Sequence, residues 1–385
     1  MDAAGKFLHH STNSVFMKSR FYYTVILLTF LMIGYNLDSN AQGCVAVRNM
    51  SSWSLGTDSI QSKTWQFSLN YRYFRSYKHF RGSHEEKERV EMGTEVINND
   101  NSVLFGASYN LNNRWSVSTV IPYLIIDRSS LYEHYGNPTA SNPTINPRFH
   151  TQARGRGDMR ISAYYNAVQK EKVGLTLGLG FKLPTGNYET KDYFHKKDSE
   201  GQDSLVYRVV DQSIQLGDGG FGFITEFDFS YNISHSVGLY ASGLYLFNPR
   251  NTNGILRSDN LTNNIPRSNE FSVVDQFVFR AGARYTWKGF QLALGGRYEG
   301  IPSEDAIGKS EGFRRPGYIV SLEPSALYTT GKHTFSVNVP IAMYRNRVQN
   351  TIDKERTEIT GSYQIGDAAF ADWLMSITYS YRLQR

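Results

Sequence analysis

The sequence predicts an all-β fold, a transmembrane antiparallel β-barrel of about 12 strands with short periplasmic turns and long outer loops. Many segments alternate apolar with small or polar side chains at a period of two, which is the spacing of a β-strand. The connections between these segments are alternately short and long. The mean hydropathy is −0.44, yet the chain holds 26 Tyr, 23 Phe and 33 Gly. Such a composition suits a barrel, because only alternate residues of each strand meet lipid.

The clearest hairpin runs from Gly155 to Tyr188. Its first strand alternates Met159, Ile161, Ala163, Tyr165 and Ala167 with Arg160, Ser162, Tyr164 and Asn166. After a polar turn at 169–172, its second strand places Leu175, Leu177, Leu179, Phe181 and Leu183 on one face. The opposite face is small or polar rather than densely charged. This pattern favours lipid outside and water or small side chains inside over a soluble sheet.

The same alternation predicts twelve strands, and most approach the roughly ten residues that cross a bilayer at a tilt. In chain order they are Thr64–Lys78, Ser102–Leu111, Trp115–Ile126, Asp158–Val168, Gly174–Leu183, Gly220–Tyr231, Ser236–Phe247, Phe271–Trp287, Phe290–Glu299, Gly317–Thr329, His333–Arg345 and Asp372–Leu383. The last strand carries an aromatic alternation like the assembly signal of exported barrels, although it lacks a terminal Phe.

The lengths of the connections separate into two classes. Short connections are expected at 112–114, 169–173, 232–235, 288–289 and 330–332, and long ones at 79–101, 127–157, 184–219, 248–270, 300–316 and 346–371. With an even number of strands and both termini in the periplasm, every short turn lies in the periplasm and every long loop outside. A soluble sandwich has no reason to segregate its loops in this way.

The N-terminal region predicts export. Lys18 and Arg20 precede an apolar run at 21–34, which is short for a spanning helix, and a small-x-small site ends at Ala41. We expect residues 1–41 to be a signal peptide whose true start is Met17, rather than a signal anchor. Residues 42–63 would then be a periplasmic N-terminal segment, and residues 64–385 the outer-membrane barrel.

The single cysteine, Cys44, is not expected to form an internal disulfide. It follows Ala41-Gln42-Gly43, which lacks the aliphatic residue of a lipoprotein signal. Cleavage after Ala41 is therefore favoured over lipidation of Cys44.

Three motifs resemble the MetA-pathway-of-phenol-degradation family of outer-membrane transporter barrels. They are Gly157-Asp158 at the head of a strand, the run LGLGFKLPTGNY at Leu177–Tyr188, and Leu216-Gly217-Asp218-Gly219-Gly220 before the next strand. The similarity covers Gly155 to about Tyr231. It implies a membrane barrel that transports small solutes, including hydrophobic or aromatic compounds.

Charged residues at inward positions form the candidate functional set. We expect the lumen to be lined by Arg72, Arg160, Lys182, Glu226, Asp228, Arg280, Arg284, Arg297, Glu299, Glu323 and Arg382. Charges in a membrane-spanning segment are costly unless they face protein or water. They could line an open pore or pair inside a plugged barrel. In a water-filled lumen, the row Arg280, Arg284 and Arg297 predicts a modest anion preference.

Other motifs carry little weight. Gly217-x-Gly219-x-x-Gly222 matches a dinucleotide fingerprint as a string, but a long polar loop precedes it and an aromatic strand follows. The nine His show no metal-binding spacing, so neither a metal nor another cofactor is expected. Neither His79 nor His333 has a Ser partner in a recognisable motif, so the chain is not expected to be an enzyme. The net charge of +6 is thinly spread, which does not indicate nucleic-acid binding.

Together these observations predict a channel for small solutes in a Gram-negative outer membrane. Its expected partners are outer-membrane lipid, the barrel assembly machinery and a small-molecule solute. Two alternatives remain open at this stage. One is a closed structural or adhesive barrel that acts through its outer loops, and the other is a secreted soluble β-sandwich.

Overall fold

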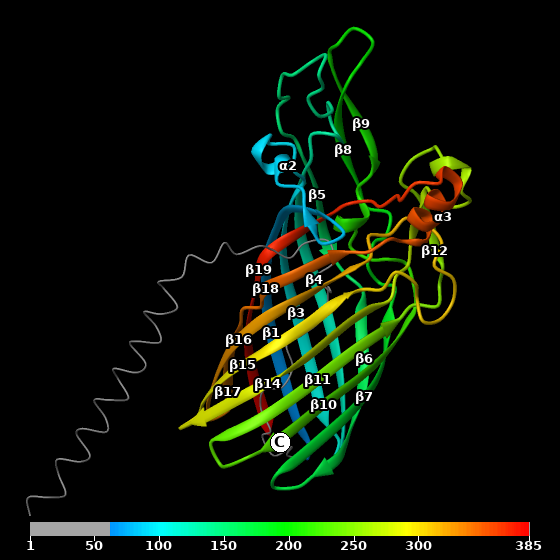
Figure 1. Cartoon of the computed structure of the whole chain (residues 1–385). Helices are drawn as coiled ribbons and strands as arrows, with labels where there is room; N and C mark the ends of the chain where they lie inside the picture. The colour runs from blue at the N-terminus through cyan, green and yellow to red at the C-terminus, as the bar shows by residue number, and fades with distance from the viewer. Residues whose placement is uncertain (1–61, 385) are drawn as a thin grey trace, which may run out of the picture. The chain divides into compact units, whose positions relative to one another are not determined.

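The computed structural model describes residues 62–384, which form a β-barrel whose strands run steeply around a common axis (Figure 1). The expected signal peptide, most of the expected periplasmic segment and Cys44 lie outside the described residues. Within 62–384, no helix combines the length and apolar character needed to span a membrane.

Twelve antiparallel strands form the wall, as the sequence predicts. Two of the twelve are each interrupted and therefore carry two labels. They are β1 (Thr64–Arg81), β3 (Ile97–Asn110), β4 (Trp115–Ser129), β5 and β6 (His150–Arg156 and Met159–Gln169), β7 (Val173–Leu183), β10 (Gly222–Asn232), β11 (Val237–Phe247), β14 (Gln276–Trp287), β15 (Phe290–Ile301), β16 (Gly317–Thr330), β17 and β18 (His333–Asn338 and Ile341–Arg347) and β19 (Ala368–Gln384). Pairing of β19 with β1 closes the sheet. This closure rules out the β-sandwich alternative.

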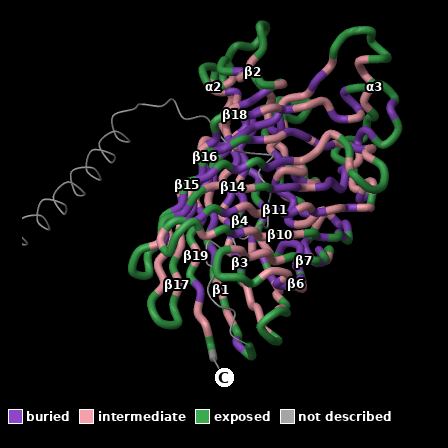
Figure 2. Tube along the Cα trace, turned by 60° about the horizontal axis from the view of Figure 1, so that its bottom comes forward, coloured by how far each residue is buried: buried purple, intermediate pink, exposed green. Residues whose placement is uncertain are grey.

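More buried and more exposed residues alternate along the strands of the wall, as the period of two requires (Figure 2). On β7, for example, Leu179 is 69% exposed while the flanking Gly178 and Gly180 are buried. Glycines at inward positions make room for large side chains. A Cβ on Gly295 of β15 would collide with the hydroxyl of Tyr240, which reaches from β11 over Gly282 of β14 along the inner wall.

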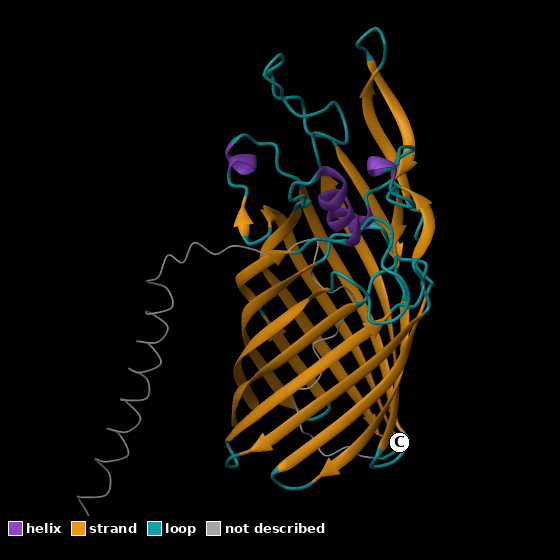
Figure 3. Ribbon diagram, turned by 45° about the vertical axis from the view of Figure 1, so that its right-hand side comes forward, coloured by secondary structure: helices purple, strands orange, loops and turns teal. Residues whose placement is uncertain are grey.

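The two ends of the barrel differ, with short turns at one end and long connections at the other (Figure 3). The long connections hold additional elements: β2 (His84–Glu85), α2 (Glu88–Glu91), β8 (Lys191–Lys197), β9 (Asp203–Val209), η1 (Gln212–Ile214), β12 (Thr252–Leu256), η2 (Thr262–Asn264), β13 (Glu270–Ser272) and α3 (Thr351–Thr360). We call this the loop end. At α3, Asn350 and Asp353 form a reciprocal capping box and Gly361 ends the helix in the left-handed conformation.

Several strands extend further into the loop end than expected. β3 begins at Ile97 rather than Ser102, because the polar residues 98–101 pair with the outer part of β1 and Ile97 pairs with Ser129 of β4. β5 was expected to be loop, yet it pairs with the outer half of β4. A chain crossing occurs at Gly157, where a Cβ would lie 3.0 Å from Pro122 Cγ and 3.2 Å from the Leu216 carbonyl oxygen. Only glycine fits this approach without a shift of its neighbours.

The expected strand Phe271–Trp287 is wrong at its start. Asp275 ends it, because its carboxylate accepts hydrogen bonds from the backbone N–H of Asn248 (2.6 Å) and of Ala306 (2.8 Å). The chain before Asp275 leaves the wall, and β13 pairs with β12 instead. The expected strand His333–Arg345 is likewise divided, because Pro340 has no N–H to donate to the ladder.

Candidate functional site

The eleven charged residues expected in the lumen occupy the face opposite the exposed aromatic and aliphatic side chains. Seven are buried, namely Arg72, Arg160, Lys182, Arg284, Arg297, Glu299 and Glu323. Glu226, Asp228, Arg280 and Arg382 are partly buried. The structure does not bring all of them into one row. It divides most of them between the middle of the barrel and the loop end, and places Arg382 by the short turn that contains Lys332.

Arg280, Arg297, Glu299 and Glu323 meet near the middle of β14, β15 and β16, and we call them the central ion cluster. Arg297 donates from Nε to Oε1 and from Nη2 to Oε2 of Glu299, both at 2.8 Å. Glu323 places Oε2 3.3 Å from Nε of Arg280 and Oε1 3.6 Å from Nη1 of Arg297. Two cations therefore face two carboxylates.

The central ion cluster leaves little free space beside it. A cavity of about 10 Å³ lies next to the cluster, and its lining also includes Arg72, Asn338, Pro340, Leu374 and Ser376. This volume is about what one water molecule needs. A solute larger than water does not fit at this point unless side chains move.

Two of the other predicted residues have partners outside the central ion cluster. Glu226 accepts hydrogen bonds from the hydroxyls of Ser162 (3.2 Å) and Tyr164 (3.0 Å). Arg284 donates from Nη2 to the side-chain oxygen of Asn232 at 2.7 Å.

A second, larger space lies toward the loop end, and we call it the outer cavity. Its volume is about 120 Å³. Its polar lining includes Arg160, Lys182, Asp158 and Asp218. Lys182 forms a short ion pair with Asp218 and lies 4.0 Å from Asp158.

The outer cavity also has an apolar side. Ile224 of β10 and Leu244 and Leu246 of β11 line it, and we call these three the apolar wall. Val278 belongs to the same buried cluster behind them. Barrel interiors of this type are polar as a rule, so an aliphatic patch facing inward is a distinct local feature.

Part of the outer cavity is lined by the segment 211–218, which contains η1 and Leu216. A buried ion network holds this segment. Arg315 donates to both carboxylate oxygens of Asp211, at 2.9 and 2.8 Å, and Arg128 lies 3.7 Å from the same carboxylate. Burial alone would raise the pKa of Asp211, but the two arginines hold it well below its ordinary value.

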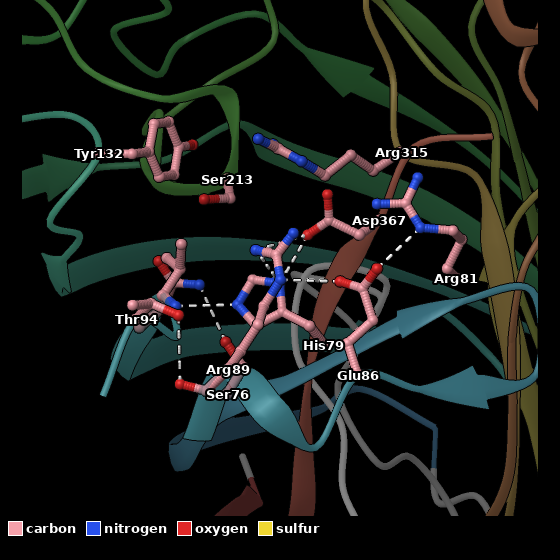
Figure 4. Close-up of polar contacts among 12 residues, drawn as sticks. Ser76, His79, Arg81, Glu86, Arg89, Thr94, Tyr132, Ser213, Arg315 and Asp367 are labelled. Carbon is pink, nitrogen blue, oxygen red and sulfur yellow. Dashed lines mark hydrogen bonds and ion pairs between the residues drawn. The ribbon is translucent and has the colours of Figure 1, made fainter. Parts of the chain in front are cut away.

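A third cluster lies between β1 and the loop-end segments (Figure 4). His79, Glu86 and Asp367 place ligand-type atoms within 4.8 Å of one another. The guanidinium of Arg89 pairs with both carboxylates of this cluster, because its Nε lies 2.8 Å from Glu86 and its Nη1 lies 3.2 Å from Asp367. The charge of the carboxylates is thus already compensated by a guanidinium, which fits a structural anchor better than a metal centre.

The tautomer of His79 follows from its neighbours. Its Nε2 accepts the backbone N–H of Val96 at 2.8 Å, so Nδ1 carries the proton and donates to Asp367 at 2.6 Å. Burial raises the pKa of Asp367, but the bond from His79 and the charge of Arg89 outweigh it and lower that pKa. These contacts tie the 84–96 segment to β1 and to the start of β19.

Sequence reasoning missed the outer cavity because it collected only charged inward residues. Ile224, Leu244 and Leu246 stand at inward positions of their strands, so a search for apolar residues at these positions would have found the apolar wall. Asp158 and Asp218 stood in the family-like motifs at 157–158 and 216–220. Their pairing with Lys182 depends on the register between β7 and its neighbours, which the motifs do not give.

No family model and no curated protein matches this sequence. Among solved structures, an outer-membrane channel from Pseudomonas putida F1 aligns with 86% of this chain and 100% of its own length, at a TM-score of 0.54 and 11% identity. The toluene transporter TodX of P. putida aligns with 85% of this chain and 91% of its own, at a TM-score of 0.40 and 11% identity. The translocator domain of the autotransporter NalP from Neisseria meningitidis aligns with 85% of this chain and 90% of its own length, at a TM-score of 0.42 and 9% identity.

The first of these likenesses shows a shared fold, that of an outer-membrane β-barrel. The other two scores are too low to add to it. The similarity says nothing by itself about what passes through the barrel.

Proposed function

We propose that this protein is an outer-membrane channel for small solutes with an apolar or aromatic body. The observation that carries the proposal is the apolar wall, which lines a cavity at the loop end of an otherwise polar interior. Hydrophobic patches facing a cavity are typical of sites that take up small molecules.

The dimensions of the outer cavity support the proposal. An apolar cavity of roughly 150 Å³ holds one benzene molecule. The outer cavity, at about 120 Å³, is therefore of the size that a single ring or a short chain needs. The Pseudomonas putida neighbour in fold is described as an outer-membrane channel, and the family that the motifs resemble consists of transporter barrels.

In the proposed mechanism, the solute enters from the loop end, which faces the outside of a Gram-negative cell. The central ion cluster closes the way further down, so passage requires Arg280 and Arg297 to separate from Glu323. The partners of this function are outer-membrane lipid around the wall and the assembly machinery that inserts exported barrels. Export by the signal peptide at 1–41 belongs to the same proposal.

A second candidate is a closed barrel with a structural or adhesive role of its loops. The compensated charges of the central ion cluster favour it, because they leave space for no more than about one water beside them. A permanently closed barrel needs no apolar wall in its interior, which is why we rank it second.

Two measurements separate the candidates. Purified protein is inserted into planar bilayers for conductance, and uptake of toluene, phenol and glucose is compared in cells with and without the gene. A channel gives discrete conductance and faster uptake of the aromatic solutes than the deletion strain. Stable insertion without conductance, together with unchanged uptake of all three solutes, supports the closed barrel instead.

A further inference from the structure

Arg160 on β6 is a buried cation for which the described part of the chain supplies no ion pair. Only 8% of the residue is exposed, and its Nε has no hydrogen-bond partner. Leaving a guanidinium buried without a partner is costly. The residue lines the outer cavity, so its guanidinium N–H groups can donate hydrogen bonds to a ligand in that cavity.

The neighbouring charges do not fulfil this role. Lys182 stands directly opposite Arg160 on β7, and like charges at such a position repel. Asp218 and Asp158 are engaged elsewhere, because they flank Lys182 and accept backbone N–H bonds from Gly220 (2.8 Å) and Gly186 (2.9 Å) respectively.

The remaining cation at the cavity, Arg315, is held by both oxygens of Asp211. Arg160 is therefore the cation of this cavity that is left to receive a ligand.

The apolar wall of the cavity selects the rest of the ligand. Ile224, Leu244 and Leu246 are between 1% and 7% exposed and offer aliphatic surface without hydrogen-bonding groups. A ligand that satisfies both sides has one anionic group and one apolar body. The volume of about 120 Å³ limits that body to one ring or a short chain.

We propose that the outer cavity binds a small monocarboxylate, with its carboxylate on Arg160 and its apolar body against the apolar wall. A guanidinium binds a carboxylate through two parallel N–H bonds, which fixes the orientation of the ligand. The inference deepens the proposed channel function, on which its role in passage rests. Binding itself can be measured independently of passage.

The test is calorimetric titration of the detergent-solubilised full chain with benzoate, benzamide and acetate. Benzoate binds more tightly than benzamide, which lacks the charge, and more tightly than acetate, which lacks the ring. Arg160→Gln lowers the benzoate affinity by about tenfold or more, because a charged hydrogen-bonded contact is lost. Arg156→Gln, which removes an exposed arginine of β5 outside the cavity, leaves the affinity unchanged.

A second variant tests the apolar wall. Ile224→Thr keeps a branched side chain but adds a hydroxyl, so it weakens benzoate binding while acetate binding stays as it was. Heat-modifiable gel mobility confirms that each variant is folded. Equal benzoate affinity of Arg160→Gln and the unchanged protein, or equal affinity for benzoate and benzamide, overturns the proposal.

Flux of benzoate and of glycerol into liposomes separates the two levels of inference. Flux of glycerol without benzoate binding would support the proposed channel and contradict the proposed carboxylate site. Benzoate binding that is weakened by Arg160→Gln, without flux of either solute, would support the proposed carboxylate site and contradict the proposed channel.

Discussion

Glu323 of β16 reaches across the neighbouring strand β15 to contact Arg280 of β14, with Oε2 3.3 Å from Nε. The contact is possible because the residue of β15 that stands opposite Glu323 is Gly295, and the next residue across is Gly282. These two glycines also make room for the hydroxyl of Tyr240, which reaches over them from β11. One carboxylate thereby serves arginines on two different strands.

This relationship changes what the row of arginines predicts. In the sequence, Arg280, Arg284 and Arg297 suggested a lumen that favours anions. In the structure, Arg280 and Arg297 both contact Glu323. The anion preference stays a prediction, and its strength should depend on Glu323.

The variant Glu323→Gln should raise the selectivity for anions over cations. It removes one negative charge beside two arginines, and both then attract anions more strongly. Reversal potentials in planar bilayers under a salt gradient measure the effect, which should weaken at high salt because of screening. Glu311→Gln removes the charge of an exposed loop residue and serves as the control. The same reversal potential for both variants would contradict the prediction.

The variant Arg297→Gln should destabilise the barrel by about 3–5 kcal/mol, because it removes the guanidinium that forms two hydrogen bonds with the buried carboxylate of Glu299. The double variant with Glu299→Gln should be closer to the unchanged protein than Arg297→Gln is, since neither buried charge of the pair remains. Urea unfolding in detergent micelles, followed by tryptophan fluorescence, measures both. If the double variant is the less stable of the two, the two residues do not act as a pair.

The variant Leu179→Arg should impair insertion by about 2–4 kcal/mol if its position is near the bilayer midplane. Leu179 points outward from β7 and is 69% exposed. Thr176→Arg is the matched change on the opposite face, where the new side chain stands next to Asp228. Refolding yields into lipid vesicles compare the two. Equal losses at both positions would invalidate the assignment of the lipid-facing side.

The contact between His134 and β8 should weaken as the pH falls from 6.5 to about 4. Burial lowers the pKa of His134 to about 4 from 6.5, so the opened state binds the proton more readily than the closed state. The stability of the contact is complete above pH 6.5, declines between these values and then stays level. Charged or titratable neighbours are Glu133, His195, Lys196 and Arg208.

Hydrogen exchange at the backbone N–H of His195 reports this opening, because that N–H donates to Nδ1 of His134 at 3.1 Å. Its protection factor should decrease over the same pH range. In His134→Phe, which keeps the ring stacked near Phe194, protection should be lower at neutral pH and vary less with pH. The same pH profile in both proteins would assign the effect to another group.

The mature protein should begin at Gln42. The charged residues before 21–34 and the small-x-small site at Ala41 predict cleavage there. N-terminal sequencing of protein extracted from outer membranes identifies the first residue. Recovery of the apolar run in the mature protein would show a signal anchor instead.

The barrel could be predicted from the sequence because the features that define its strands involve residues close together in the chain. Alternation along each strand and the short turns between strands depend on neighbouring residues, and Leu179 or Phe181 can be assigned to a face without any partner. The start of β14 depends on Asp275, which binds backbone groups of Asn248 and Ala306 at a distance in the chain. The pattern of β14 alone does not contain that information.

The candidate site was predictable only in part, for the same reason. Parity identified which charges face inward, but whether they are paired depends on register across several strands and on glycines such as Gly295. The outer cavity also depends on the segment 211–218, whose place is fixed by Arg128 and Arg315. These contacts join parts of the chain that are far apart in sequence.

The first strand, β1, and the last strand, β19, close the barrel, and this has a consequence for biogenesis. The side chain of Asn70 on β1 donates to Ser376 of β19 at 2.7 Å, across 306 positions of sequence. Until β19 has been delivered, β1 on one side and β17 with β18 on the other present unpaired edges, which are prone to adhere to other chains. A chain truncated before β19 would have a ladder that cannot be completed. Quality control during export must therefore keep nearly the entire polypeptide from self-association until its final strand arrives.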